Sequence, residues 1–255
     1  MNNIIFSIIL TTIASFSTLF GLFVLLLSRK RQKFIIVNSI FFSTGVILSV
    51  CFNELLPESL NLIGNHFPIM YKILIVLLFS LLGFFIAFSI DMLIPNKFNN
   101  IDSNNTLIYR VGIVSMIALF VHNIPEGIAT FLAASADISS GIPLIISIAM
   151  HNIPEGISIS VPIYYATNSF KKSFKYTFIS GTAEILGAII AYLVLKRFIN
   201  DFYMAIILLL TFGIMLHVCL FELLPSIKNY KKRIINYFFF ILGYSLIIFL
   251  HAIFK

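Results

Sequence analysis

The six residues His122-Asn-Ile-Pro-Glu-Gly127 recur letter for letter as His151-Asn-Ile-Pro-Glu-Gly156. Both copies lie in the middle of long apolar stretches. A charged side chain at the centre of a lipid bilayer costs about 2.5–3.5 kcal/mol even on lenient insertion scales. A chain that places the same histidine and glutamate there twice is holding something polar between two helices. A metal ion fits this pattern best.

Hydrophobic residues make up 60% of the 255 residues, and charged residues only 11%. This composition excludes a soluble domain and predicts an all-α polytopic membrane protein, with one integral membrane domain over residues 1–255. The net charge of +7 does not indicate a nucleic-acid partner, because the basic residues are confined to short loops. Cys51 and Cys219 lie in apolar runs and do not suggest a disulfide framework. We expect no cleaved signal peptide.

A helix of about 20 apolar residues crosses the hydrocarbon core of a bilayer. Eight stretches of the chain qualify as transmembrane helices. They are Ile4–Leu27, Phe34–Leu56, Ile73–Ile94, Leu107–Ala134, Ile142–Tyr165, Phe174–Leu195, Ala205–Leu224 and Ile234–Phe254.

Lysines and arginines are distributed unevenly between the loops on the two sides. The first, third, fifth and seventh loops hold thirteen of the 17, with Arg110 counted in the third loop. Basic loops stay on the cytoplasmic side. We therefore expect a multi-pass protein of the plasma membrane with both termini outside the cytoplasm.

A second repeat relates residues 45–57 to residues 213–225. Eight of the thirteen aligned positions are identical, including the Glu-Leu-Leu-Pro segments that begin at Glu54 and Glu222. The second span thus pairs with the seventh, and the fourth with the fifth, so that partners cross the membrane in opposite senses. The alternative is chance similarity between low-complexity apolar helices. We favour inverted repeats, spans 1–3 against 6–8 and span 4 against 5, which are typical of alternating-access transporters.

Helical geometry places each motif glutamate between its histidine and its asparagine. With His122 at 0°, Glu126 lies at about 40° and Asn123 at about 100° around the helix. Glu126 could therefore share its carboxylate between a metal ion held by His122 and a second one held by Asn123. His151, Asn152 and Glu155 repeat this arrangement on the next span.

Glu184 is a third candidate glutamate, flanked by small residues in Ser180-Gly-Thr-Ala-Glu184. Together with the two motifs it gives nitrogen and carboxylate donors and no thiolate, which suits Zn²⁺ and also Fe²⁺, Co²⁺ or Mn²⁺. The alternative is a buried polar cluster that only holds helices together. Asn or Ser would do that at lower cost than Glu, so we favour a metal site.

The chain resembles the ZIP family, the Zrt- and Irt-like metal transporters, and most closely its GufA- and ZupT-like bacterial branch. The resemblance covers all eight spans. It is carried by the paired His-Asn-Ile-Pro-Glu-Gly motifs, the Ser180–Glu184 segment and the Glu-Leu-Leu-Pro segments of spans 2 and 7.

This resemblance implies a divalent-metal importer, for zinc above all and also for iron, manganese, cobalt or cadmium, with no catalytic cofactor. It implies two metal positions. The first would use His122, Glu126, His151 and Glu155, and the second Asn123, Glu126, Asn152, Glu155 and Glu184. It further implies a homodimer, and an elevator-like shift of spans 1, 4, 5 and 6 against 2, 3, 7 and 8.

The sequence departs from the family pattern in two places. Some relatives supply a methionine from span 2, where this chain has Ile47. The loop between spans 3 and 4 is rich in histidine in many eukaryotic relatives, but here it has none between Pro95 and Arg110. A soft ligand and metal sensing by that loop are therefore not expected.

Three further carboxylates lie near the ends of spans 2 and 7. We interpret Glu54, Glu58 and Glu222 as waypoints for a cation on its way to and from the site. The alternative is that they reach into the interface as ordinary polar side chains.

Other polar residues are assigned no firm role. Cys51 and Cys219 could be transient soft ligands, but buried inert thiols are favoured. His217 lies about 140° from Glu222 around its helix and is expected to pack elsewhere. His66 is expected to be exposed, and His251 and Asp91 are given no role.

Two other functions would also place His and Glu in a membrane. An intramembrane metal-dependent hydrolase often shows a His-Glu-x-x-His pair and an open metal position, and the chain has no such motif. A metal receptor without flux is the second alternative. Two near-equivalent half-sites favour transport over both.

Overall fold

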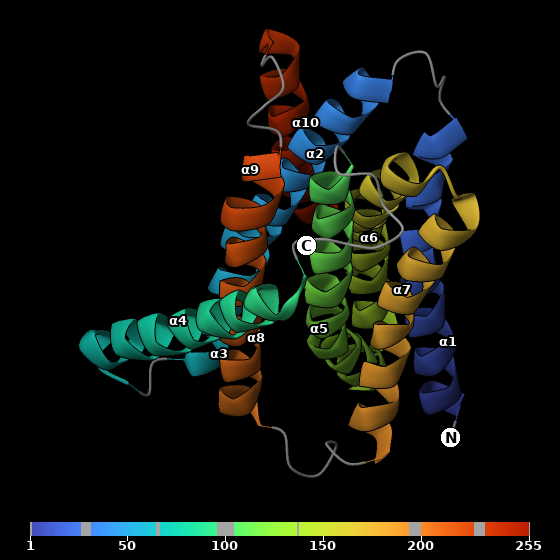
Figure 1. Cartoon of the computed structure of the whole chain (residues 1–255). Helices are drawn as coiled ribbons and strands as arrows, with labels where there is room; N and C mark the ends of the chain where they lie inside the picture. The colour runs from blue at the N-terminus through green and yellow to red at the C-terminus, as the bar shows by residue number, and fades with distance from the viewer. Residues whose placement is uncertain are drawn as a thin grey trace.

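The computed structural model describes residues 2–26, 32–64, 67–95, 105–136, 138–193, 200–226 and 233–254. Every element in these ranges is a helix, and together they make eight long helical segments, which confirms the expected fold class (Figure 1). Seven of the eight are long and apolar enough to cross a membrane. The fifth segment, α6, spans 30 residues and carries the second copy of the motif.

The segments follow one another along the chain, and three of them combine several helical elements. The bounds are α1 (Asn2–Ser17) with the 3₁₀ helix η1 (Thr18–Leu26); α2 (Gln32–Val50), the π-helix η3 (Cys51–Leu55) and α3 (Leu56–Ile63); α4 (Ile69–Leu93); α5 (Thr106–Ala136); α6 (Ile138–Thr167); α7 (Phe170–Leu193); α8 (Asp201–His217), the π-helix η5 (Val218–Leu223) and α9 (Leu224–Ser226); and α10 (Ile234–Phe254).

Several helices extend beyond the ends expected from hydropathy. The expected break at 136–143 is largely helical, because α5 runs to Ala136 and α6 begins at Ile138. Hydropathy detects the apolar part of a helix, whereas backbone hydrogen bonds continue into polar residues. The second segment ends at Gly64, whose φ of 63° is the left-handed conformation that glycine adopts readily.

The helices form two groups that meet along the site. The site group consists of α1 with η1, α5, α6 and α7, which pack extensively on one another. In the flanking group α2 packs on α10, and α8 packs on α4 and α3. Contacts between the groups are fewer and run mainly from α2 to α6 and from α5 to α8. Figure 1 shows α4 crossing the other helices at a steep angle and extending beyond them.

The π-helices support the second internal repeat. Both η3 and η5 contain a cysteine and a glutamate at matching positions of that repeat. Close helix contacts also match, because a Cβ at Gly45 would overlap the Phe240 carbonyl of α10, and one at Gly213 would overlap the Ser80 carbonyl of α4. The pairing of α2 with α10 is thus repeated as the pairing of α8 with α4.

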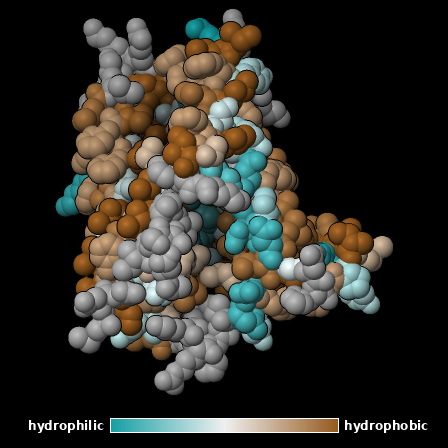
Figure 2. Space-filling view, turned by 180° about the vertical axis from the view of Figure 1, so that it is seen from behind, coloured by the Kyte–Doolittle hydropathy of each residue, from teal (hydrophilic) through white to brown (hydrophobic). Residues whose placement is uncertain are grey.

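The surface is apolar over much of its area, as expected for contact with lipid. Most large side chains along α4 are exposed, among them Leu74, Leu78 and Phe85. Figure 2 shows the face turned away in Figure 1, where the largest group of hydrophilic residues forms a column down the middle, with smaller patches at the edges. Cys51 and Cys219 are fully buried in the main apolar core and are not bonded to each other.

Candidate metal centre

The two motifs face one another from the middle of α5 and α6. Both helices continue through a motif proline, although proline cannot donate a hydrogen bond to the carbonyl four residues before it. The motif glycines allow close packing on the other two helices of the site group. A Cβ at Gly127 would overlap the Glu184 carbonyl of α7, and one at Gly156 would overlap the Thr18 carbonyl of η1.

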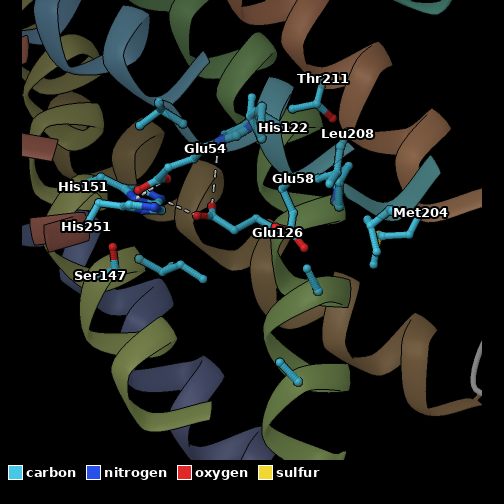
Figure 3. A pocket seen from close by; sticks show the side chains of 17 residues that line it. Glu54, Glu58, His122, Glu126, Ser147, His151, Met204, Leu208, Thr211 and His251 are labelled. Atoms are coloured by element: carbon cyan, nitrogen blue, oxygen red, sulfur yellow. Dashed lines mark hydrogen bonds and ion pairs between the residues drawn. The ribbon is translucent and has the colours of Figure 1, made fainter. Parts of the chain in front are cut away.

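The structure brings together all four residues of the first predicted position. His122 Nε2 lies 3.4 Å from Glu155 Oε1 and 3.9 Å from Glu126 Oε2. His151 Nε2 contacts Glu126 Oε1 (Figure 3). Each histidine therefore reaches the glutamate of the other helix. One ligand atom each from His122, Glu126 and Glu155 lies within 4.8 Å of the other two, a span that one cation can bridge.

The asparagines lie toward α7 and α1. The Asn152 side-chain amide donates a 3.0 Å hydrogen bond to the Ala14 carbonyl and also contacts Glu184 Oε1. The Asn123 amide donates a 3.2 Å bond to the Ser180 carbonyl, one turn before Glu184. In both asparagines the NH₂ group is thus held by backbone, whereas Oδ1 has no hydrogen-bond partner.

Burial and missing partners distinguish this cluster from ordinary helix contacts. None of the seven predicted ligands is more than 9% exposed. Unpartnered buried atoms include Glu126 Oε2, both carboxylate oxygens of Glu155, and Glu184 Oε2. Within the described residues, the only ion-pair partners of Glu126 and Glu155 in the site group are the two histidines. Buried carboxylate oxygens without hydrogen-bond partners are costly, and a divalent cation would supply the missing interaction.

A cavity of about 630 Å³ leads to the site from one side (Figure 3). It is lined by His122, Glu126 and His151 and extends past Ala133, near the end of α5, to Met204, near the start of α8. Glu58 and His251 also line it, although no role was predicted for His251.

Glu54 is closer to the site than its predicted role as a waypoint suggests. Its Oε2 atom lies 3.7 Å from His151 Nδ1, so that this carboxylate faces the ring nitrogen turned away from Glu126. The Glu-Leu-Leu-Pro repeat identified Glu54 as a residue of interest, but the sequence alone does not indicate which histidine it meets.

Glu222 and Asp91 lie away from the cluster and share one partner. Arg110 Nη1 donates a 2.8 Å hydrogen bond to Glu222 Oε1, and its Nη2 contacts Asp91 Oδ1. Arg110, counted above as a loop residue, in fact lies in the first turns of α5. At a junction of loop and span, residue type alone does not decide between the two.

The remaining predicted residues fall outside the cluster. His217 is fully buried among the rings of Phe84, Phe88 and Phe221, and neither ring nitrogen has a hydrogen-bond partner. Ile47 is fully buried in the core. His66 and the loop at 96–104 lie outside the described residues.

Comparisons with known proteins agree with this architecture. Residues 103–251 match the sequence profile of the family described as ZIP Zinc transporter. Zinc transporter ZupT of Streptococcus mutans is 35% identical over 233 residues, which is 88% of each chain. ZupT of Chlorobium chlorochromatii is 35% identical over 91% of each chain.

A shorter match covers about half of each chain. ZupT of Oceanobacillus iheyensis is 52% identical over 130 residues, which is 51% of this chain and 48% of the relative. The profile match and the two matches over nearly the whole chain agree with the paired motifs of α5 and α6. The chain therefore belongs to the ZIP zinc transporter family, and the resemblance noted in its sequence is confirmed.

Proposed function

We propose that this protein imports zinc into the cytoplasm through a binuclear site between α5, α6 and α7. The observation that carries the proposal is the crossed pairing of two histidines with two glutamates, in a buried cluster that leaves carboxylate and amide oxygens without partners. The cluster needs positive charge, and a divalent cation provides it. Zn²⁺ accepts such nitrogen and oxygen ligands without a strong geometric preference, which suits stepwise ligand exchange.

The two metal positions share the glutamates. His122 and His151 would bind the first ion together with Glu126 and Glu155. The second ion would lie toward α7, held by Asn123, Asn152 and Glu184 and by the same two glutamates. The hydrogen bonds from the asparagine NH₂ groups to the Ser180 and Ala14 carbonyls support this arrangement, because they leave Oδ1 of each asparagine free to bind a cation.

The transport mechanism would be alternating access, with the site group moving against the flanking group. The inverted repeats and the limited contacts between the groups support such a motion. The cavity extends past Ala133 toward Met204, on the side of the loops that we expect outside the cell. On this proposal the structure is open to the outside, and Glu54 and Glu58 attract the arriving ion.

Iron, manganese, cobalt and cadmium are further candidate substrates, because nitrogen and carboxylate ligands accept all of them. We also propose that the protein works as a homodimer in the plasma membrane, with the exposed apolar face of α4 available for contact. The hydrolase alternative is set aside, because the family consists of transporters. A receptor without flux is the remaining competitor.

Metal uptake into proteoliposomes tests the proposal. Purified protein is reconstituted around a zinc-sensitive dye, and uptake is compared with that of the Glu126→Gln variant and of empty vesicles. We expect zinc to enter only with the unaltered protein, and competition by Fe²⁺, Mn²⁺, Co²⁺ or Cd²⁺ would rank the other substrates. Zinc that binds to the protein without entering the lumen would overturn transport in favour of a receptor.

A further inference from the structure

One buried ion-pair cluster, formed by Arg110, Asp91 and Glu222, lies outside the metal centre. Arg110 donates through Nη1 to Glu222 Oε1 at 2.8 Å and through Nη2 to the Asp91 carbonyl at 3.0 Å, and Nη2 also contacts the Asp91 carboxylate. The Arg110 and Asp91 side chains are 16% and 17% exposed, and that of Glu222 only 4%. One guanidinium thus pairs with two carboxylates at a position with little exposure to solvent.

This cluster joins the two groups of helices. Arg110 belongs to α5 of the site group, whereas Asp91 and Glu222 belong to α4 and η5 of the flanking group. Sliding of one group against the other would separate the charges. Breaking a buried ion pair is costly, because each charge is left uncompensated. The cluster therefore stabilises the relative position of the groups that the structure shows.

The cluster also lies on the closed side of the site. Arg110 precedes His122 on α5 by about 18 Å of helix rise, whereas the cavity leaves the site in the other direction, toward Ala133. Ser115, which is on the same helix face as His122 and lies between it and Arg110, is fully buried. The site is therefore open toward the cavity, whereas toward the ion pairs Ser115 is shielded from solvent.

The internal repeat places a corresponding glutamate on each side of the site. Glu54 in η3 and Glu222 in η5 occupy matching positions of the repeat. Glu54 lines the cavity and faces His151, whereas Glu222 is held by Arg110. Inverted repeats that exchange their arrangements between states would also exchange the roles of these glutamates.

We propose that Arg110, Asp91 and Glu222 form the closed gate of the metal pathway on the side opposite the cavity. Once this gate opens, Glu222 lines the pathway on its side of the site, as Glu54 lines the cavity on the other side. The proposal rests on the alternating access proposed above. Its test measures conformation and requires neither zinc binding nor transport.

The test uses two cysteine reporters in a background where Cys51 and Cys219 are replaced by alanine. Ser115→Cys reports the sealed side and Ala133→Cys reports the cavity. The protein is placed in nanodiscs, which expose both faces to a water-soluble maleimide. Arg110→Gln should raise the labelling rate of the first reporter by about tenfold or more and lower that of the second. Arg110→Lys should give an intermediate result, because lysine keeps the charge but not the two-pronged geometry.

Asn236→Ala is the matched control. It removes a buried 2.7 Å hydrogen bond from Asn236 to Asn38 within the flanking group, so it loosens the protein without freeing one group from the other. We expect it to leave both labelling rates unchanged. The gate proposal is overturned if Arg110→Gln leaves the labelling rate of Ser115→Cys unchanged. It is also overturned if both labelling rates rise together, as a general loss of packing would cause. A reciprocal shift in a protein that fails to take up zinc would support the gate and refute the proposed function instead.

Discussion

At the scale of single residues, the crossed contacts of the two histidines define the centre. His122 meets Glu155 and His151 meets Glu126, so each motif is completed by the other helix. Glu54 adds a carboxylate beside the second nitrogen of His151. A carboxylate in that place fixes the orientation of a metal-binding histidine and strengthens it as a ligand.

Replacing Glu54 should therefore weaken metal binding without removing a site. We expect Glu54→Gln to lower zinc affinity by about 10- to 100-fold, because His151 loses its orienting partner. The number of bound ions at saturation should not change. Isothermal titration calorimetry measures both quantities. Glu58→Gln is the control, since Glu58 also lines the cavity but has no described contact with His151, and an equal loss there would point to a general effect of cavity charge.

The sequence predicted which side chains gather in the cluster better than it predicted their surroundings. Residues of one helix have fixed angular relations, so the place of Glu126 between His122 and Asn123 follows from the helical repeat alone. The contact of Glu54 with His151 and the pairing of Arg110 with Glu222 depend on how separate helices pack. That information is not contained in the periodicity of either helix.

At the scale of elements, small residues set the distances between helices. The α5–α7 contact is the most extensive in the site group, and it requires Gly127 opposite the Glu184 carbonyl. The repeats predicted which spans correspond, and the similar close contacts of Gly45 in α2 and Gly213 in α8 agree with the pairing of spans 2 and 7. The π-helices, the near-continuity of α5 and α6 and the steep crossing of α4 were not predictable, because each arises from packing between helices rather than from composition.

Substitution of Gly127 should disturb both stability and metal binding. Gly127→Ala places a methyl group against the rigid carbonyl of Glu184, which should cost about 1–3 kcal/mol and push α7 away from α5. The variant should melt at a lower temperature and bind less zinc at the position that uses Glu184. Gly112→Ala in the same helix is the control, because its methyl would overlap the Ile163 side chain, which can move, and would lie 3.2 Å from the nearest backbone atom, the Ile163 nitrogen. Equal losses in the two variants would argue against this account.

At the scale of the whole molecule, the distribution of basic residues predicts how the chain is oriented in the membrane, and the cavity lies on the side predicted to face outward. The distribution of basic residues predicts that the C-terminal end of α5 and the N-terminal end of α8 lie on the outer side, and the cavity extends toward Ala133 and Met204 at these ends. The Arg110 cluster closes the other side. Under the proposed function, these features correspond to an importer in its outward-open state.

Cysteine labelling in intact cells tests this orientation. Single cysteines near Asn2, Asp137 or Lys255 should react with a membrane-impermeant reagent, because the positive-inside rule places these positions outside. Cysteines near Lys172 or Lys231 should react only after the cells are permeabilised. The native Cys51 and Cys219 are fully buried and should contribute little background. Labelling at Lys231 from outside would reverse the orientation and, with it, the direction assigned to the cavity.

The central claim is that two metal ions share Glu126 and Glu155, and elemental analysis of purified variants tests it most directly. Glu126→Ala should lose nearly all bound zinc, whereas Glu184→Ala should keep about one equivalent, since it removes a ligand from one position only. His122→Ala should also keep about one equivalent, held by Asn123, Asn152 and Glu184. Gel filtration shows whether each variant remains folded, and Glu58→Ala should retain both ions. If Glu184→Ala loses all bound zinc while Glu126→Ala keeps one equivalent, the shared-glutamate site is wrong.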